Sequence, residues 1–247
     1  MDQVIDRRAR KLQEFFGVSG AVLPDAPPPV PDPALEDFNL EWHVMPPAAV
    51  VPFDSRYTDL LYPAAPHDFM AAGVHPLSPR DAIAASHRRY EGTYFAIETT
   101  QKPRYLPGNR QSYGTLFGFD PTRDPFSRYF GAAGFTEQSR YGHDYVAIAK
   151  FVEIVSEDWR SRGLLPAGYR VTLCPPALFN LLGVVFHPEW SETETLELGF
   201  HRDAHGNASC FELGSNAPGD FSFIRAIETG SEWTLLGFRT ALVPANR

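Results

Sequence analysis

The stretch Thr193–Arg239, TETLELGFHRDAHGNASCFELGSNAPGDFSFIRAIETGSEWTLLGFR, decides the fold class. Short runs rich in apolar and aromatic residues alternate here with turn-forming segments such as 203–207. This pattern predicts consecutive strands that pair as an antiparallel meander. The predicted strands lie near 194–202, 208–214, 220–227 and 232–239.

Helices precede this run of strands. Apolar residues at helical spacing predict a long helix from Asp144 to about Arg162. A strand at 169–173 leads into a helix that begins at Pro175, and Ser78-Pro79 is a typical helix start. Helices followed by a meander are typical of the α+β class. We therefore expect residues 36–247 to form one α+β domain, with a mostly antiparallel sheet packed by helices.

The first 35 residues have a different character. Residues 3–16 show the spacing of an amphipathic helix, and six prolines between Pro24 and Pro33 predict an extended linker. Residues 1–35 are thus expected to be a helical arm on a proline-rich linker. The arm either docks a protein partner or a second copy of the chain, or it packs back on its own domain.

The composition excludes several classes of protein. The chain has 247 residues, of which 43% are hydrophobic and 21% charged, as in ordinary globular proteins. A net charge of −8 argues against binding to nucleic acid, which needs a basic excess. The longest nearly apolar run, 177–186, is too short to cross a membrane. The absence of a secretory signal and the two cysteines predict a cytoplasmic protein, and the preference for arginine over lysine indicates a bacterial genome of high GC content.

Cys174 is the first candidate for chemistry, because a predicted strand ends there and a helix opens at Pro175. The N-terminus of a helix lowers the pKa of a thiol and favours the nucleophilic thiolate. Catalysis would also need a nearby base, such as His143, His187 or His201. Alternatively, Cys174 is a small apolar side chain buried between strand and helix.

A second candidate is a metal site formed by His201, Asp203 and His205. Side chains alternate along a strand, so Glu197, His201 and Asp203 would share one face. Imidazoles and carboxylates arranged in this way can hold zinc, iron or manganese. The alternative is a solvated polar face that leads into a hairpin turn.

A third candidate is a basic loop that would bind an anionic ligand. It contains Lys102, Arg104, Tyr105, Arg110 and Tyr113. Guanidinium groups bind carboxylates and phosphates well, and tyrosine rings stack on flat ligands. The alternative is a surface loop that pairs with acidic strands of the same domain.

No motif in the sequence fixes a reaction, and no cofactor can be named. The preferred hypothesis is a soluble cytoplasmic domain that binds a small polar or anionic molecule and could turn it over. The alternative is a structural protein that docks to an assembly, or to itself, through residues 1–35. Whether the protein is an enzyme stays open at this level.

Overall fold

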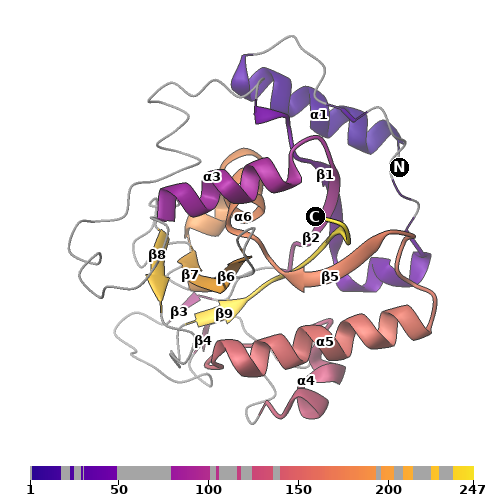
Figure 1. The fold of residues 1–247 in the computed structure, drawn as a ribbon, viewed down its shortest axis with the longest axis vertical. Coiled ribbons are helices and arrows are strands. Elements are labelled where there is room, and N and C mark those ends of the chain that lie inside the picture. Colours follow the sequence, from indigo (N-terminus) through magenta and orange to yellow (C-terminus); the bar gives the residue numbers. More distant parts are fainter. Residues whose placement is uncertain are drawn as a thin grey trace.

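The computed structural model describes residues 2–17, 23–24, 29, 31–48, 79–100, 104–105, 116–117, 124–135, 140–192, 196–202, 208–213, 224–227 and 236–247. Within these residues, helices pack against two four-stranded sheets, and a further sheet has two strands (Figure 1). The two short strands are β3 (Arg104–Tyr105) and β4 (Leu116–Phe117). The predicted α+β class is confirmed.

The first sheet is antiparallel throughout and has the strand order β1-β2-β10-β5. Every side chain of β2 is buried, as expected for a central strand. The sequence pattern predicts β5 at its observed bounds but predicts neither β1 nor β10. The strands are β1 (Leu40–Val44), β2 (Tyr94–Glu98), β5 (Tyr169–Leu173) and β10 (Thr240–Pro244).

The second sheet has the order β8-β7-β6-β9 and contains the strands predicted from the C-terminal stretch. Its first three strands pair antiparallel, but β9 lies parallel to β6. The expected meander is therefore wrong for its last strand. The strands are β6 (Leu196–Arg202), β7 (Ala208–Leu213), β8 (Ile224–Ile227) and β9 (Leu236–Phe238).

The position of β9 follows from the strand that comes after it. Only Arg239 separates β9 from β10, so the chain passes directly from the second sheet into the first. Gly237 lets the backbone of β9 pass close to the ring of Tyr141 at this point. A Cβ at position 237 would lie only 2.6 Å from Cε1 of Tyr141. A strand placed beside β8, as in a meander, could not make this connection.

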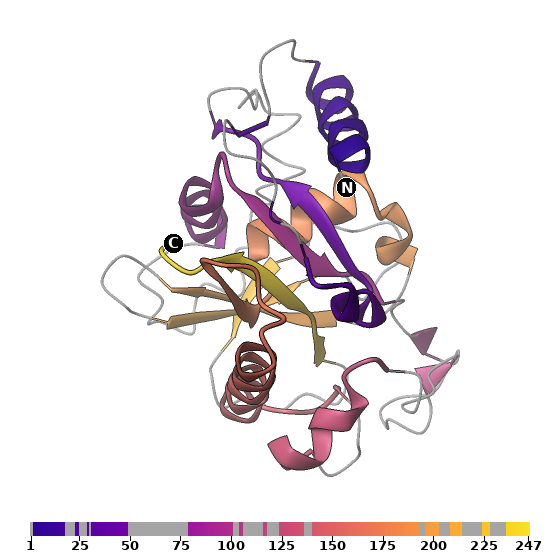
Figure 2. The same ribbon diagram turned by 90° about the vertical axis from the view of Figure 1, so that its right-hand side faces the viewer.

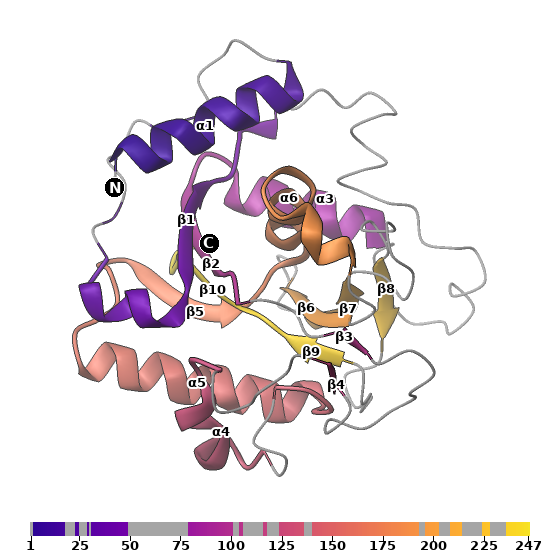
Figure 3. The same ribbon diagram turned by 180° about the vertical axis from the view of Figure 1, so that it is seen from behind.

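Helices lie on both sides of the first sheet. In Figures 2 and 3, α4 and α5 lie below this sheet, and α1, α3 and α6 lie above it. None of the described helices combines the length and the apolar character needed to cross a bilayer. The helices are α1 (Asp2–Phe16), α3 (Pro79–Tyr90), α4 (Ser127–Ala133), α5 (Tyr145–Ser161) and α6 (Pro176–Val185), with 3-10 helices at Pro33–Phe38 and Pro188–Glu192.

The N-terminal helix α1 packs on its own chain, which is one of the two arrangements expected from the sequence. Arg8 donates to the carbonyl of Trp42 at 2.7 Å and to the carboxylate of Glu41 at 2.6 Å. Residues 25–28 and 30 of the proline tract lie outside the described residues. Docking of a partner or a second copy on residues 1–35 stays a prediction. The buried residues of α1 are Ile5, Ala9, Leu12 and Phe16.

The long helix α5 is capped as its sequence predicts. The side chain of Asp144 accepts a hydrogen bond from the backbone N–H of Ala147 at 2.8 Å. One face of the helix is fully buried, through Ile148, Phe151, Val155 and Trp159. This face fixes α5 below the first sheet and leaves its neighbouring face beside β5.

Asp144→Ala should lower the free energy of unfolding by about 1 kcal/mol, because the N-terminal N–H groups of α5 lose their acceptor. For a chain of this length, such a loss lowers Tm by about 2–4 °C. Asp144→Ser keeps an oxygen at the cap and should change Tm much less. Equal losses in the two variants, measured by thermal unfolding, would contradict the capping role.

Candidate functional site

A pocket of about 240 Å³ opens between the end of α3 and the start of β5. Three arginines line it: Arg89 from α3, Arg170 from β5 and Arg247 after β10. None of the described lining side chains is acidic. We call this the arginine pocket, and its other lining residues are Tyr90, Thr172, Pro175, Phe200 and Ala245.

Local sequence explains how these arginines are positioned. The last turn of α3 is basic, and cations there are stabilised by the negative end of the helix dipole. Along β5, side chains alternate, so Arg170 and Thr172 lie on the same face. The guanidinium of Arg170 also donates to a main-chain oxygen of Arg247, the last residue of the sequence, at 3.2 Å, which ties Arg247 to β5.

Tyr90 forms a buried wall of the arginine pocket, with 4% of its surface exposed. Burial raises the pKa of its phenol, while the charges of Arg170 and Arg89 oppose this shift. Both arginines therefore act on the same phenol, and the phenol keeps its proton. A protonated Tyr90 adds a possible hydrogen-bond donor to the three cations.

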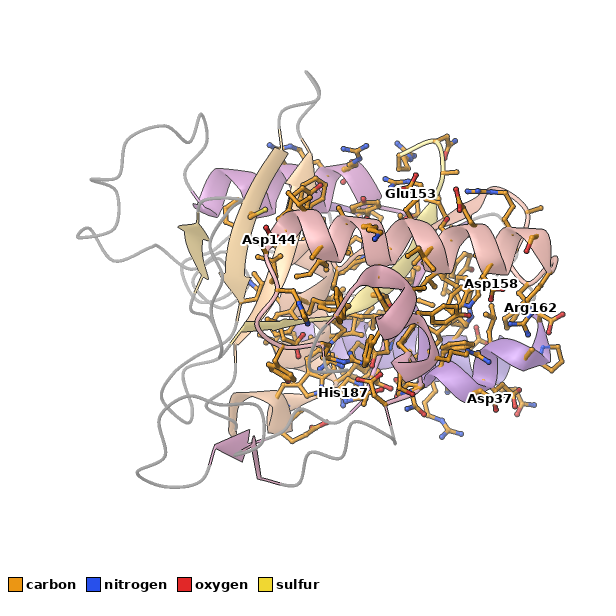
Figure 4. The ribbon with its side chains drawn as sticks, turned by 90° about the horizontal axis from the view of Figure 1, so that it is seen from below. Asp37, Asp144, Glu153, Asp158, Arg162 and His187 are labelled. Carbon is orange, nitrogen blue, oxygen red and sulfur yellow. The ribbon has the colours of Figure 1, made fainter. Side chains whose placement is uncertain are left out.

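A larger groove of about 440 Å³ adjoins the arginine pocket and lies between α5 and β5. The two hollows share Arg170, Thr172 and Phe200. Figure 4 shows Glu153 midway along α5, on the side opposite His187. We call this hollow the α5–β5 groove, and its remaining lining residues are Tyr145, Ala149, Val152, Glu153, Ser156, Glu157, Arg160, Val171 and Leu173.

Cys174 lies next to Pro175 of the arginine pocket but is only 1% exposed. Burial raises the pKa of its thiol well above the ordinary value, and the carboxylate of Glu197 acts in the same direction. The lowered pKa expected at a helix start is therefore wrong, because burial outweighs the helix dipole. Within the described residues, no contact joins Cys174 to a histidine, and its catalytic role stays a prediction.

His187 lies away from the arginine pocket, between two carboxylates. Its Nδ1 is 2.8 Å from Glu189, its Nε2 is 3.5 Å from Glu41, and its ring stacks on Trp190. Burial acts to lower the pKa of His187, but the two carboxylates outweigh it and the pKa is raised. His187 therefore keeps its proton to a higher pH than a free imidazole does, and its role as a base stays a prediction.

Glu41 is the centre of this second cluster. It accepts from Arg8 and lies 3.3 Å from Nε2 of the buried His43. His187 and His43 are the main reasons why the pKa of Glu41 is far below its usual range. The cluster joins α1, β1 and the 3-10 helix that follows α6, so it fastens the N-terminal helix to the sheet.

The predicted metal site falls mostly on residues outside the description. His201 belongs to β6, but its side chain, like Asp203 and His205, is not among the described parts. Elsewhere in the described chain, no three histidine, cysteine, aspartate or glutamate side chains gather as metal ligands would. The metal site stays a prediction.

The predicted basic loop also falls mostly on residues outside the description. Arg104 and Tyr105 form the strand β3, whose side chains lie outside the described residues. Lys102, Arg110 and Tyr113 are outside them entirely. Ligand binding by this loop therefore stays a prediction.

A buried ionic network connects the two large sheets. Arg140 donates to both oxygens of Asp124 at 2.6 Å and to Glu98 at 2.7 Å. Arg239 donates to both oxygens of Glu197, at 2.7 and 2.8 Å. Burial acts to lower the pKa of Arg140, but the carboxylates of Asp124 and Glu98 outweigh it and the pKa is raised. Since all five side chains are buried, the network serves the fold rather than a ligand.

Arg89, Arg170 and Arg247 belong to none of the candidate sites that the sequence predicts. They come from three elements far apart in the chain, and no local motif joins them. The only local signal is the alternation that puts Arg170 and Thr172 on one face of a short strand. No protein-family model, curated protein or solved structure matches this chain.

Proposed function

We propose that the protein binds a small anionic ligand in the arginine pocket. The observation that carries this proposal is the convergence of three arginines on a pocket whose described lining includes no acidic side chain. The chain as a whole has a net charge of −8, so this local positive charge stands out against an acidic background. An anion is the ligand that such a site attracts.

The other lining groups suit a carboxylate or phosphate. Guanidinium groups can bind either anion through two parallel hydrogen bonds. The hydroxyl of Thr172 and the phenol of Tyr90 are further polar groups, and the ring of Phe200 offers an apolar wall. A volume of about 240 Å³ favours a small ligand or one end of a larger molecule.

The proposal is one of binding rather than catalysis. Cys174 is the reactive residue type nearest to the pocket in sequence, and its buried, protonated thiol does not favour nucleophilic attack. Both cysteines of the chain are free and buried, which supports the further proposal of a reducing, cytoplasmic location.

Thermal unfolding in phosphate, citrate and benzoate, against sodium chloride of equal ionic strength, tests the proposal. An anion at about 100 times its Kd should stabilise the protein by about 2.7 kcal/mol, or roughly 5–10 °C. Arg170→Gln should weaken binding about tenfold or more, because hydrogen bonds from a charged donor are lost.

Arg162→Gln is the matched control, since Arg162 lies outside the pocket and pairs with Asp158 at 3.1 Å. This variant should bind the anion as the unchanged protein does. The proposal fails if none of the three anions shifts Tm beyond chloride, or if Arg170→Gln and Arg162→Gln respond alike.

A further inference from the structure

The arginine pocket and the α5–β5 groove share a wall. Arg170, Thr172 and Phe200 line both hollows. Phe200 is held from two sides, because its backbone N–H donates to the carbonyl of Cys174 at 3.3 Å and its ring stacks on Tyr145 with centroids 4.9 Å apart. A ligand too long for the arginine pocket can therefore continue past a fixed aromatic ring into the groove.

The two hollows differ in charge. The described side chains of the arginine pocket include three arginines and no acidic group. The α5–β5 groove instead has Glu153, Glu157 and Arg160 from α5, besides the shared Arg170. When Arg170 is assigned to an anion in the arginine pocket, two carboxylates and one guanidinium remain in the groove, a net charge of −1. The groove is therefore complementary to a single positive charge.

Glu153 and Glu157 lie one turn apart on the same exposed face of α5, where Figure 4 shows Glu153. Neither side chain forms an ion pair or a hydrogen bond with a described residue. Arg160 is three residues from Glu157, but its guanidinium donates to Oγ of Ser156 at 3.3 Å. Glu153 is two turns from Arg160, so it is the carboxylate more available to a cation on a ligand.

Apolar side chains lie beside Glu153 in the groove. Val152 precedes it directly, and Ala149 lies one turn earlier on the same face of α5. Both are half-buried, and Leu173 lines the groove from β5. An aliphatic chain or a ring that covers them removes apolar surface from water, which stabilises a complex. The groove thus suits an apolar spacer that ends in a cation.

We infer that the ligand of the arginine pocket is a dipolar molecule, with a phosphate or carboxylate at one end and a protonated amine at the other. The inference rests on the proposed function, since it names the class of ligand that the anion site takes. Arg89, Arg170 and Arg247 bind the anionic end. The spacer passes Phe200, and the amine lies beside Glu153 in the α5–β5 groove. A simple anion uses only the arginine pocket and binds more weakly.

Calorimetric titration of the full-length protein with matched compounds tests the inference. One series runs from aminoethyl- to aminooctylphosphonate, and the second has the same chains without the amine. At the best length, the amine should lower Kd by about fivefold or more. Affinity should pass through a maximum, because short chains do not reach Glu153 and long ones lose more entropy on binding. The same comparison with amino-terminated carboxylic acids identifies which anionic end the protein prefers.

Substitutions separate the two ends of the ligand. Glu153→Gln should remove the preference for the amine and leave the binding of amine-free phosphonates unchanged. Glu157→Gln should reduce the preference less, because Arg160 lies three residues away. Arg170→Gln should weaken both series, since both share the anionic end. Glu14→Gln on α1 is the matched control: it changes the net charge equally but lies outside both hollows, so it should alter neither series.

The outcomes separate this inference from the proposed function. If no chain length gives a preference for the amine, or if Glu153→Gln retains the preference, the dipolar ligand is overturned. Amine-free phosphonates that bind through Arg170 would in that case still support the proposed function. A preference that Glu14→Gln reduces as much as Glu153→Gln would also overturn the inference, because the net charge of the protein would then attract the amine. If neither series binds and no simple anion binds, both ideas are overturned.

Discussion

Arg239→Met should lower the free energy of unfolding by about 3–5 kcal/mol, the largest loss we expect from a single substitution. The guanidinium of Arg239 is 2% exposed and donates to both oxygens of the buried Glu197. It also donates to the carbonyls of Glu98 and Thr100, at 2.7 and 3.0 Å. Methionine fills part of the volume but leaves a buried carboxylate and two carbonyls without their donor.

Urea unfolding measures this loss, and Tm should fall by at least about 6 °C in a chain of this length. Arg162→Met is the control: its exposed pair with Asp158 is worth only about 0.5 kcal/mol. Adding Glu197→Leu to Arg239→Met should recover much of the stability, because the buried carboxylate that had lost its partner is then removed as well. A loss below about 1 kcal/mol for Arg239→Met would show that the network contributes little to the fold.

Acid should destabilise the protein through His43, by about 3 kcal/mol between pH 6.5 and pH 4. Burial lowers the pKa of His43 from 6.5 to about 4, against the opposing effect of Glu41. Between these two pKa values, the unfolded chain therefore binds a proton at His43 that the folded chain does not bind. Stability from His43 is complete above pH 6.5 and is lost as the pH falls towards 4.

The neighbouring groups either titrate in a different pH range from His43, or their contribution cancels when the protein is compared with a variant that lacks His43. The raised pKa of His187 gives stability that is complete below pH 6.5 and lost as the pH rises. The lowered pKa of Glu41 matters only below about pH 4.5. His87, whose pKa is also lowered by burial, adds to the loss in the same window as His43.

His43→Phe isolates the contribution of His43, because phenylalanine keeps the ring packing against Phe186 and cannot titrate. The measurement is urea unfolding of both proteins at several pH values from 6.5 down to 4.5. The difference between them should change by roughly 1.4 kcal/mol per pH unit in this range. Parallel curves would mean that His43 is not the acid-sensitive group.

The helical part of the fold could be predicted because local signals agree there. The core-facing stripe of α5 and its cap at Asp144 are both visible in the sequence, and β5 was predicted at its observed bounds. β1 and β10 lack such signals: β1 is a short strand in a proline-interrupted segment, and β10 ends at Pro244. Their identity depends on pairing with β2, which no local pattern encodes.

The arginine pocket contains the residue types that the sequence led us to expect at an anion site, but at other positions of the chain. Arginines and aromatic rings were expected to bind an anion, yet the pocket that the structure describes is built from α3, β5 and the end of the chain. For Cys174, the sequence indicates the start of a helix, which lowers the pKa of a thiol. It does not indicate the burial of the side chain, which raises that pKa and outweighs the helix. Long-range packing decides both results, and a single sequence shows packing only indirectly.

The contact of α1 with the outer strand β1 also restricts how copies of this protein can associate. Filaments that grow by sheet extension need two unpaired strand edges on every subunit, one for each neighbour. Here Arg8 of α1 donates to the carbonyl of Trp42 on the outer strand β1, so another copy cannot extend the sheet at this edge without displacing α1. The N-terminal helix α1 thus protects the sheet against strand-by-strand association at the edge formed by β1.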